Sequence, residues 1–176
     1  KKGDILCDVG ANVGAYSLIA AKHGIHSYAF EPSGSNYSSL IRNIALNDFG
    51  LYILPVPFAL SDKTGIRFFH HSDLRPGHAL HSLDPESYDG IVLQQLIAVV
   101  SLDDVIAWMR PAPPTHLKID VDGHELQILK GARKTLGAVR EILVELTDDS
   151  AGEVSAYLAV LGFAYKPGEK PISGSG

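Results

Sequence analysis

Apolar strand-like segments alternate with helix-like segments along most of this 176-residue chain, and this alternation constrains the fold more than any other feature. The predicted strands cover residues 4–9, 27–30, 51–58, 116–121 and 141–146, and the predicted helices cover residues 14–23, 36–47, 105–109, 125–136 and 151–161. Strands that are almost entirely apolar and lead into helices are typical of a parallel sheet with both faces covered. We therefore predict an α/β fold, a Rossmann-like, doubly wound and mostly parallel sheet.

The alternation of strands and helices is interrupted in the middle of the chain, where two strand-like segments follow each other without a helix between them. We expect residues 66–70 and 96–100 to pair as an antiparallel β-hairpin insertion, joined by a long polar loop at residues 72–88. A last strand is expected at residues 163–166. Residues 1–166 are predicted to form a single domain, and residues 167–176, rich in Gly, Pro and Ser, a loose C-terminal tail.

Composition argues against several classes of protein. The net charge of −5 is unfavourable for a nucleic-acid surface, which needs a concentrated positive field. No apolar run reaches the roughly 18 residues that a membrane span requires. Cys7 is the single cysteine, so no internal disulfide points to secretion, and we expect a cytoplasmic protein. The chain begins at Lys1 without Met and enters a strand almost at once, so we expect an N-terminal segment to be missing.

The stretch DVGANVG lies between the first predicted strand and the first predicted helix, where α/β folds bind nucleotides. Gly10 and Gly14 allow a sharp turn and a close approach of a ligand to the backbone. The dinucleotide pattern G-x-G-x-x-G would need glycine at Asn12 and Ala15, so a pyrophosphate is disfavoured. Asp8 would repel a phosphate but suits a cation. S-adenosylmethionine carries a sulfonium and an ammonium group and no phosphate.

Glu31 ends the second predicted strand, where a carboxylate can accept hydrogen bonds from both ribose hydroxyls of a nucleoside. The backbone near Ala59 and the carboxylate of Asp62 could meet the adenine amine. An alternative is that the acids only cap strand ends and the glycines only make a turn. For a bound S-adenosylmethionine we expect contacts with the following residues: Asp8, Gly10, Ala11, Asn12, Gly14, Glu31, Ala59, Asp62 and Asp120.

Several motifs follow one another over about residues 4–146: DVGANVGAYS, AFEPS, NIALN, ALSDKTG, VVSLDDVI, HLKIDVDGHELQILKGA and ILVEL. In this order they resemble the FkbM family of class I, S-adenosylmethionine-dependent methyltransferases. The resemblance implies a seven-stranded sheet of the class I methyltransferase type, with one antiparallel strand near its C-terminal end. It also implies methyl transfer, mostly to oxygen, on small molecules such as polyketide hydroxyls and sugars. The family often has Glu where Asp122 stands.

The segment LKIDVDGHE places polar residues at the end of an otherwise apolar strand. Alternation along a strand would put Lys118, Asp120 and Asp122 on one face, with Lys118 as a counter-ion. We expect Asp120 to lie nearest the methyl group and the acceptor, Asp122 to act as a base or positioning group, and His124 to be a candidate base near neutral pH. The alternatives are a structural salt bridge with helix capping for the two aspartates, and a solvated first-turn histidine for His124.

Glu145 ends the next predicted strand and would face the same cleft. We expect it to bind the substrate, with an ion pair to a basic neighbour as the alternative. Together with Asp120 and Asp122 it could offer oxygen ligands to Mg²⁺, but these acids already have a use near a sulfonium, so we predict no metal site.

Four histidines gather in or beside the long loop, at positions 70, 71, 78 and 81. Their spacing matches no common zinc signature. A loop that folds over the acceptor, with its histidines and Arg75 near the substrate, explains them better than a metal does.

The function predicted from these residues is an S-adenosylmethionine-dependent methyltransferase acting on a hydroxyl of a small molecule or glycan, by in-line transfer. An NAD-dependent oxidoreductase is one alternative, although it needs glycines that this turn lacks. A catalytically inactive cofactor-binding domain is another. A nucleic-acid methyltransferase is disfavoured by the acidic charge and by the lack of an N-P-P-Y/F motif at the fourth strand.

Overall fold

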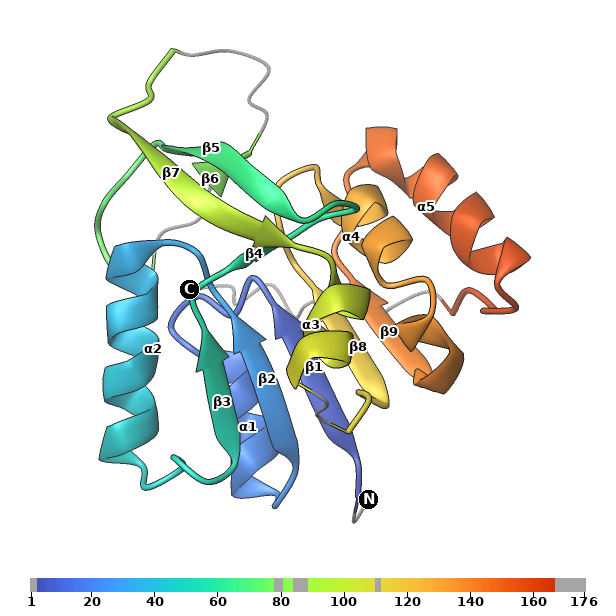
Figure 1. Cartoon of the computed structure of the whole chain (residues 1–176), viewed down its shortest axis with the longest axis horizontal. Helices are drawn as coiled ribbons and strands as arrows, with labels where there is room; N and C mark the ends of the chain where they lie inside the picture. The colour runs from blue at the N-terminus through green and yellow to red at the C-terminus, as the bar shows by residue number, and fades with distance from the viewer. Residues whose placement is uncertain (1–2, 78–80, 84–88, 110–111, 167–176) are drawn as a thin grey trace, which may run out of the picture.

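The computed structural model describes residues 3–77, 81–83, 89–109 and 112–166, and its centre is a parallel β-sheet (Figure 1). Five strands lie in the order β3-β2-β1-β8-β9, and every neighbouring pair is parallel. Their bounds are β1 (Ile5–Val9), β2 (His26–Phe30), β3 (Ile53–Val56), β8 (His116–Ile119) and β9 (Glu141–Val144). The chain runs outward from β1 in both directions, so the switch point of the sheet lies between β1 and β8. This confirms the predicted doubly wound α/β fold.

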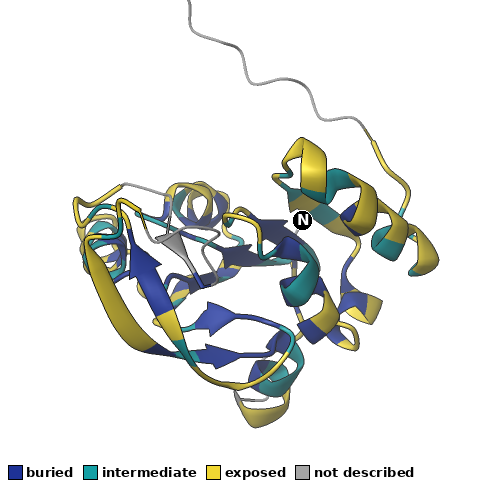
Figure 2. Cartoon of the chain, turned by 90° about the horizontal axis from the view of Figure 1, so that it is seen from above, coloured by how far each residue is buried: buried dark blue, intermediate teal, exposed yellow. Residues whose placement is uncertain are grey.

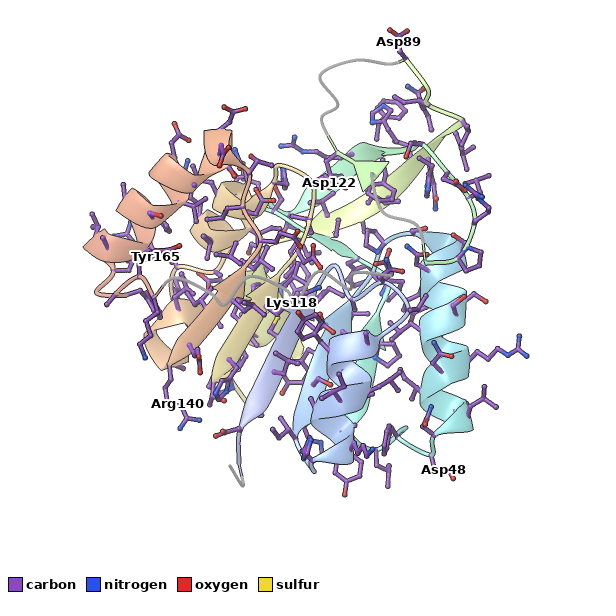
Figure 3. All side chains as sticks on the ribbon, turned by 180° about the vertical axis from the view of Figure 1, so that it is seen from behind. Asp48, Asp89, Lys118, Asp122, Arg140 and Tyr165 are labelled. Atoms are coloured by element: carbon purple, nitrogen blue, oxygen red, sulfur yellow. The ribbon has the colours of Figure 1, made fainter. Side chains whose placement is uncertain are left out.

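Helices cover both faces of this sheet. They are α1 (Ala15–Lys22), α2 (Gly34–Leu46), α3 (Leu102–Met109), α4 (Glu125–Gly131) and α5 (Asp148–Val160), with a 3-10 turn at Thr135–Ala138. Helices α1 and α3 lie on opposite faces (Figures 1 and 3). Buried residues of α1 and α2 pack in one apolar cluster, and those of α3, α4 and α5 in another.

The strands supply both apolar clusters because their side chains alternate between the two faces. Phe30 belongs to the cluster that contains residues of α3, α4 and α5, whereas the preceding residue, Ala29, belongs to the cluster with α1 and α2. Figure 2 shows buried residues gathered in the strands and exposed residues on the outward surfaces of the helices. Burial on both faces is the physical reason that these strands are almost entirely apolar.

A second, mixed sheet lies beyond the carboxyl ends of the main-sheet strands (Figure 1). Its order is β4-β7-β5-β6, with bounds β4 (Ala59–Leu60), β5 (Gly65–His71), β6 (His81–Ser82) and β7 (Leu93–Val100). Strands β5 and β7 are antiparallel, with Ile66 opposite Ala98 and His70 opposite Gln94, which confirms the predicted hairpin. Strand β4 pairs with β7 in the parallel direction.

The structure differs from the sequence prediction in how its strands are divided. The predicted strand at 51–58 is shorter in the structure, where β3 ends at Val56, because Pro57 has no N–H to donate to a sheet. Strand β4, which the sequence analysis did not predict, follows at Ala59–Leu60 and joins the second sheet. Within the described residues the strands form two sheets instead of the single seven-stranded sheet that the resemblance implied. Residues 163–166 form no strand, and the predicted tail at 167–176 lies outside the described residues.

Helix bounds also differ from the prediction at several ends. Helix α5 begins at Asp148 rather than at residue 151, because Thr147 and Ser150 form a capping box ahead of it. Helix α3 begins at Leu102 rather than at residue 105, and Ser101 caps its first turn, since the N–H of Asp104 donates to Ser101 Oγ (3.1 Å). No helix among the described residues is long and apolar enough to cross a bilayer.

Gly131, the last residue of α4, fixes how closely this helix approaches the second sheet. A Cβ atom at Gly131 would lie 1.9 Å from the backbone oxygen of Ser61, the residue that follows β4. No real Cβ atom tolerates that distance to a backbone atom, so the helix packs directly on the chain after β4 only because the position is glycine. This contact explains the glycine of the LKGA motif in structural terms.

We predict that Gly131→Ala lowers the free energy of unfolding by about 3 kcal/mol, because the backbone after β4 or the helix must move. Gly152→Ala is a matched control within α5, where an added Cβ meets no atom within 4 Å. That control should gain up to about 1 kcal/mol from helix propensity. Urea denaturation midpoints measure both, and equal effects of the two substitutions would contradict the close packing of α4.

Candidate functional site

A cleft opens at the carboxyl ends of β1, β2 and β8, beneath the second sheet. Its empty volume is about 780 Å³, open solvent at the mouth included. Asp122, which lines the cleft, lies between the main sheet and the second sheet (Figure 3). The lining residues are Val9, Gly10, Asn12, Phe30, Glu31, Pro32, Asn36, Phe58, Ala59, Leu60, Phe69, Leu83, Asp120, Val121, Asp122, His124 and Ile128.

The glycine turn needs its glycines for two different reasons. Gly10, Asn12 and Gly14 all have positive φ angles, of 72°, 52° and 98°. A Cβ atom at Gly10 would also lie 2.0 Å from the backbone oxygen of Asp120, so the turn packs against the end of β8. At Gly14 a Cβ atom would meet the side chain of Leu40 at 2.6 Å, which brings the start of α1 close to α2. The turn is therefore a fixed part of the cleft floor.

Glu31 connects the glycine turn to the chain that follows β2 through two hydrogen bonds. Its Oε2 accepts a hydrogen bond from the N–H of Asn12 (2.8 Å), and its Oε1 accepts one from the N–H of Ser33 (2.8 Å). Burial raises the pKa of Glu31 above its ordinary value, although both of these hydrogen bonds act in the opposite direction. Each carboxylate oxygen has a second acceptor position, so Glu31 can also bind two hydroxyl groups of a ligand.

Asp8 lies below the cleft and does not line it. Its side chain is fully buried, and Oδ2 accepts hydrogen bonds from Ser17 Oγ (2.7 Å) and from the N–H of Ser17 (3.2 Å). The Nζ atom of Lys118 lies 3.3 Å from Asp8 Oδ1. Asp8 and Lys118 are register partners on β1 and β8, so the ion pair spans the switch point of the sheet.

Lys118 joins the glycine turn to the acidic end of β8. Its Nζ donates to the backbone oxygens of Gly10 (2.8 Å) and Val9 (3.4 Å) and lies 3.2 Å from Asp120 Oδ2. The side chain of Lys118 is only 6% exposed, whereas that of Asp120 is 47% exposed. Lys118 therefore acts as the predicted counter-ion. Its ammonium group contacts Asp8, Asp120 and backbone oxygens, and of these two carboxylates only that of Asp120 is open to the cleft.

Glu145 stands beside Asp120 at the end of the neighbouring strand. Ile119 and Val144 are register partners, and the N–H of Glu145 donates to the backbone oxygen of Ile119 (3.0 Å). A hydrogen bond with Asp120 and the charge of that residue raise the pKa of Glu145 above its ordinary value. Glu145 therefore holds a proton more readily than an isolated glutamate does. Its side chain does not itself line the cleft.

The remaining predicted residues follow β8. Strand β8 ends at Ile119, so Asp122 does not continue the expected alternation with Lys118 and Asp120. It lies in a turn instead, where it is exposed and lines the cleft. His124 also lines the cleft, and its Nε2 lies 2.8 Å from Ser61 Oγ. Asp62 faces that serine rather than the cleft, since its Oδ1 accepts a hydrogen bond from Ser61 Oγ (3.2 Å).

The structure thus brings most of the predicted site together. Seven of the predicted residues line the cleft: Gly10, Asn12, Glu31, Ala59, Asp120, Asp122 and His124. Five do not: Asp8, Ala11, Gly14, Asp62 and Glu145. Ala11 supports the turn from below, because its N–H and that of Gly10 both donate to the backbone oxygen of Phe30 (2.9 and 3.1 Å).

Sequence reasoning missed Asn36 and the apolar walls of the cleft. Asn36 is 2% exposed, and its Oδ1 accepts a hydrogen bond from the N–H of Gly77 (2.8 Å), while Asn12 Nδ2 donates to the backbone oxygen of Gly77 (3.2 Å). The described part of the predicted loop thus reaches the cleft. A polar residue on the buried face of α2 was the available signal for Asn36. Phe69 and Leu83 gave none, because only the hairpin packing brings them to the cleft.

The predicted histidine group is only partly described. His70 and His71 are buried on β5, and His71 Nε2 lies 3.2 Å from Gln95 Oε1. His78 and the side chain of His81 lie outside the described residues. Within the part of the chain that the structure describes, no group of three or more His, Cys, Asp or Glu side chains has a metal-binding arrangement.

The chemistry of the cleft fits a cationic nucleoside better than a dinucleotide. Among its described lining residues none is Lys or Arg, so a pyrophosphate would face carboxylates without a compensating charge. Asn12 Oδ1 is buried without a hydrogen-bond partner among the described residues, which leaves it available to a donor group of a ligand. The fold and the site therefore define an α/β protein with an acidic cleft at the switch point of a doubly wound sheet.

Comparison with known proteins identifies the family. The model of the Methyltransferase FkbM domain matches residues 8–165, and the chain belongs to the FkbM methyltransferase family. The chain is 30% identical to the 31-O-demethyl-FK506 methyltransferase FkbM of Streptomyces tacrolimicus, over 98% of this chain and 77% of that protein. It is 27% identical to the hexuronic acid methyltransferase AglP of Haloferax volcanii, over 83% of this chain.

A solved structure has the same fold. The methyltransferase FkbM from Methylobacillus flagellatus KT superposes with a TM-score of 0.61 at 22% identity, over 90% of this chain and 37% of that one. The chain spans 57% of the length of the Haloferax relative. It therefore corresponds to part of these longer proteins.

We predict that Lys118→Met destabilises the fold by about 3 kcal/mol or more, because the fully buried Asp8 carboxylate then lacks a cation. The double variant Asp8→Asn/Lys118→Met should lose less than the single variant. An asparagine at position 8 carries no charge and can still accept the Ser17 hydrogen bond. Urea denaturation of the set measures the difference, and a double variant at least as unstable as Lys118→Met would contradict the role of the ion pair.

We also predict a pH-dependent effect of Glu145→Gln on stability. The folded state raises the pKa of Glu145, so this group stabilises the fold below its unfolded pKa of about 4.3 and loses that contribution as the pH rises through the folded value. Glutamine stays neutral and can still donate to Asp120. The variant should therefore gain stability relative to the wild type as the pH rises from about 4 to about 8.

Chemical denaturation at a series of pH values measures this difference. Glu141→Gln, at the other end of β9 and exposed, is the matched control. A constant stability difference between Glu145→Gln and the wild type across the pH series would contradict the raised pKa of Glu145.

Proposed function

We propose that this chain is the catalytic part of an S-adenosylmethionine-dependent methyltransferase that acts on a hydroxyl group of a small molecule or sugar. The observation that carries the proposal is the composition of one cleft. A glycine turn, a ribose-binding type of glutamate and two exposed aspartates meet there, and no Lys or Arg is among the described lining residues. Membership of the FkbM methyltransferase family supports the same reaction class.

In this proposal the carboxyl ends of β1, β2 and β8 would hold the cofactor. Glu31 would accept hydrogen bonds from the ribose hydroxyls, and the turn from Gly10 to Gly14 would hold the nucleoside through its backbone. Asp120 would offer a negative charge to the cationic groups of the cofactor. The apolar lining near Ala59, which includes Phe58 and Ile128, would hold the adenine ring. Asp8 contributes indirectly, by holding Lys118 in place.

When bound, S-adenosylmethionine supplies an electrophilic methyl group whose bond to sulfur breaks, with the electron pair remaining on sulfur, as the acceptor oxygen attacks. The chain must then align the acceptor and remove its proton. Asp120 and Asp122 are placed to orient the acceptor hydroxyl, because both line the cleft and are exposed. His124 lines the same cleft and is placed to accept the proton. Glu145 stands beside Asp120 at the end of the neighbouring strand and supports its position.

The acceptor class is proposed from the relatives. One is named as a hexuronic acid methyltransferase and another as a methyltransferase of 31-O-demethyl-FK506, a hydroxylated small molecule by its name. These names support a sugar or a polyketide-like alcohol as the acceptor of this chain. They also suggest which compounds a screen should contain.

We predict that isothermal titration calorimetry detects binding of S-adenosylmethionine and S-adenosylhomocysteine but not of NAD. Glu31→Ala should weaken binding by about 10-fold or more, because hydrogen bonds to a charged group are lost. Asp120→Asn should reduce methyl transfer more than it reduces cofactor binding. A labelled-methyl assay with a panel of sugars, uronic acids and macrolide alcohols measures the transfer.

Glu141→Ala, at the far end of β9 from the cleft, is the control for both measurements. Binding of NAD without binding of S-adenosylmethionine would refute the proposed function. Wild-type turnover by Asp120→Asn would refute the role of Asp120 while leaving the function in place.

A further inference from the structure

Gly77 is the point at which the chain that follows β5 reaches the cleft. Residues 72–77, here called the strap, run from the end of β5 towards the start of α2 (Figure 1). The N–H of Gly77 donates a hydrogen bond to Asn36 Oδ1 (2.8 Å), and its backbone oxygen accepts one from Asn12 Nδ2 (3.2 Å). Both asparagines line the cleft. A single residue therefore ties the strap to α2 and to the glycine turn.

The strap has an ordered turn of its own ahead of Gly77. Asp73 Oδ1 accepts a hydrogen bond from the N–H of Arg75 (2.8 Å), and Asp73 Oδ2 accepts one from Arg75 Nε (2.9 Å). Gly77 itself has a φ angle of 87°, which lies in the left-handed region, and an added Cβ atom would meet no atom within 4 Å. A substitution at Gly77 therefore acts through the backbone conformation and not through a steric clash.

The contact with Gly77 decides which way the side-chain amide of Asn12 faces. A backbone oxygen can only accept a hydrogen bond, so the NH₂ group of the amide must face Gly77. The other end of the amide, Oδ1, is buried without a hydrogen-bond partner among the described residues, which leaves it for a donor group of a ligand. The backbone N–H of the same residue donates to Glu31 Oε2 (2.8 Å). Asn12 thus connects the strap to the proposed ribose-binding carboxylate.

We propose that Gly77 is a positioning residue for the cofactor, because docking of the strap orients the Asn12 amide so that Oδ1 accepts a hydrogen bond from the bound nucleoside. The inference rests on the proposed function for the identity of this ligand. The coupling is reciprocal, since a ligand that binds more tightly to the docked form stabilises that form by the same factor. Binding of the cofactor therefore also holds the strap against the cleft.

The first test is calorimetric titration with S-adenosylhomocysteine. Gly77→Ala should weaken binding about 5-fold or more, because a left-handed backbone is unfavourable for alanine and the strap is docked for a smaller fraction of the time. Gly77→Asn should recover part of the affinity, because asparagine adopts positive φ angles more readily. Equal affinity of Gly77→Ala and the wild type would overturn the inference.

Gly24→Ala is the matched control for backbone strain. Gly24 also has a positive φ angle (72°), and an added Cβ atom there also meets no atom within 4 Å. It lies between α1 and β2, ahead of the strand and away from the cleft at the carboxyl end. Its affinity for S-adenosylhomocysteine should stay within about two-fold of the wild type, since strain at an independent site does not couple to the ligand.

A double-mutant cycle tests whether Gly77 acts through Asn12. Asn12→Gly removes the side-chain amide and keeps the positive φ angle without strain. The double variant Asn12→Gly/Gly77→Ala should bind S-adenosylhomocysteine within about two-fold of Asn12→Gly alone, because the strap then has no amide to orient. Losses that multiply in full would show that Gly77 acts independently of Asn12 and would overturn the inference.

Amide hydrogen exchange of the strap gives the reciprocal readout. Saturating S-adenosylhomocysteine should slow exchange of the Gly77 N–H about 5-fold or more in the wild type and by less than about two-fold in Asn12→Gly. The same slowing in both proteins would contradict coupling through the amide. Failure of the wild type to bind either S-adenosylmethionine or S-adenosylhomocysteine would refute the proposed function, and the coupling with it.

Discussion

The buried ammonium group of Lys118 is the interaction on which the rest of the cleft depends. It neutralises Asp8 inside the sheet, forms an ion pair with Asp120 at the cleft surface and donates a hydrogen bond to the backbone oxygen of Gly10. A lysine this deeply buried is stable only because every side of its head group meets an oxygen atom or an aromatic ring, the latter from Tyr16 (5.2 Å to the ring centre). The cost of burying its charge is thereby offset, and the turn and the acidic strand end become one unit.

Two close backbone approaches complete this arrangement. Gly10 allows the glycine turn to touch the end of β8, and Gly131 allows α4 to touch the chain after β4. Both contacts join segments that are far apart in sequence, and each would be blocked by a single methyl group. The cleft is consequently shaped by backbone packing as much as by side chains. Its polar groups can hold fixed positions because the elements that carry them cannot move apart independently.

The sequence predicted the parallel half of the fold because each strand is buried on both faces, and that burial leaves an apolar signature. Glu31 and Asp120 were predictable because strand ends converge in such a sheet. The burial of the Asp8 side chain inside the sheet was not predictable, since it depends on the register that pairs Asp8 with Lys118. The bond between Ser61 and His124 joins residues 63 positions apart, and no local pattern indicates it. The glycine of LKGA was visible, but its reason appears only in the packed structure.

The two halves of the cleft are therefore built on different principles. The half formed by β1, β2 and β8 is fixed by buried charge and by backbone contacts. The half formed by the second sheet contributes apolar side chains such as Phe69 and touches the turn through Gly77. Apolar walls tolerate substitution without leaving a buried charge unpaired. Substitutions of apolar residues in the second sheet can accordingly change the shape of the cleft while Lys118 and its partners stay unaltered.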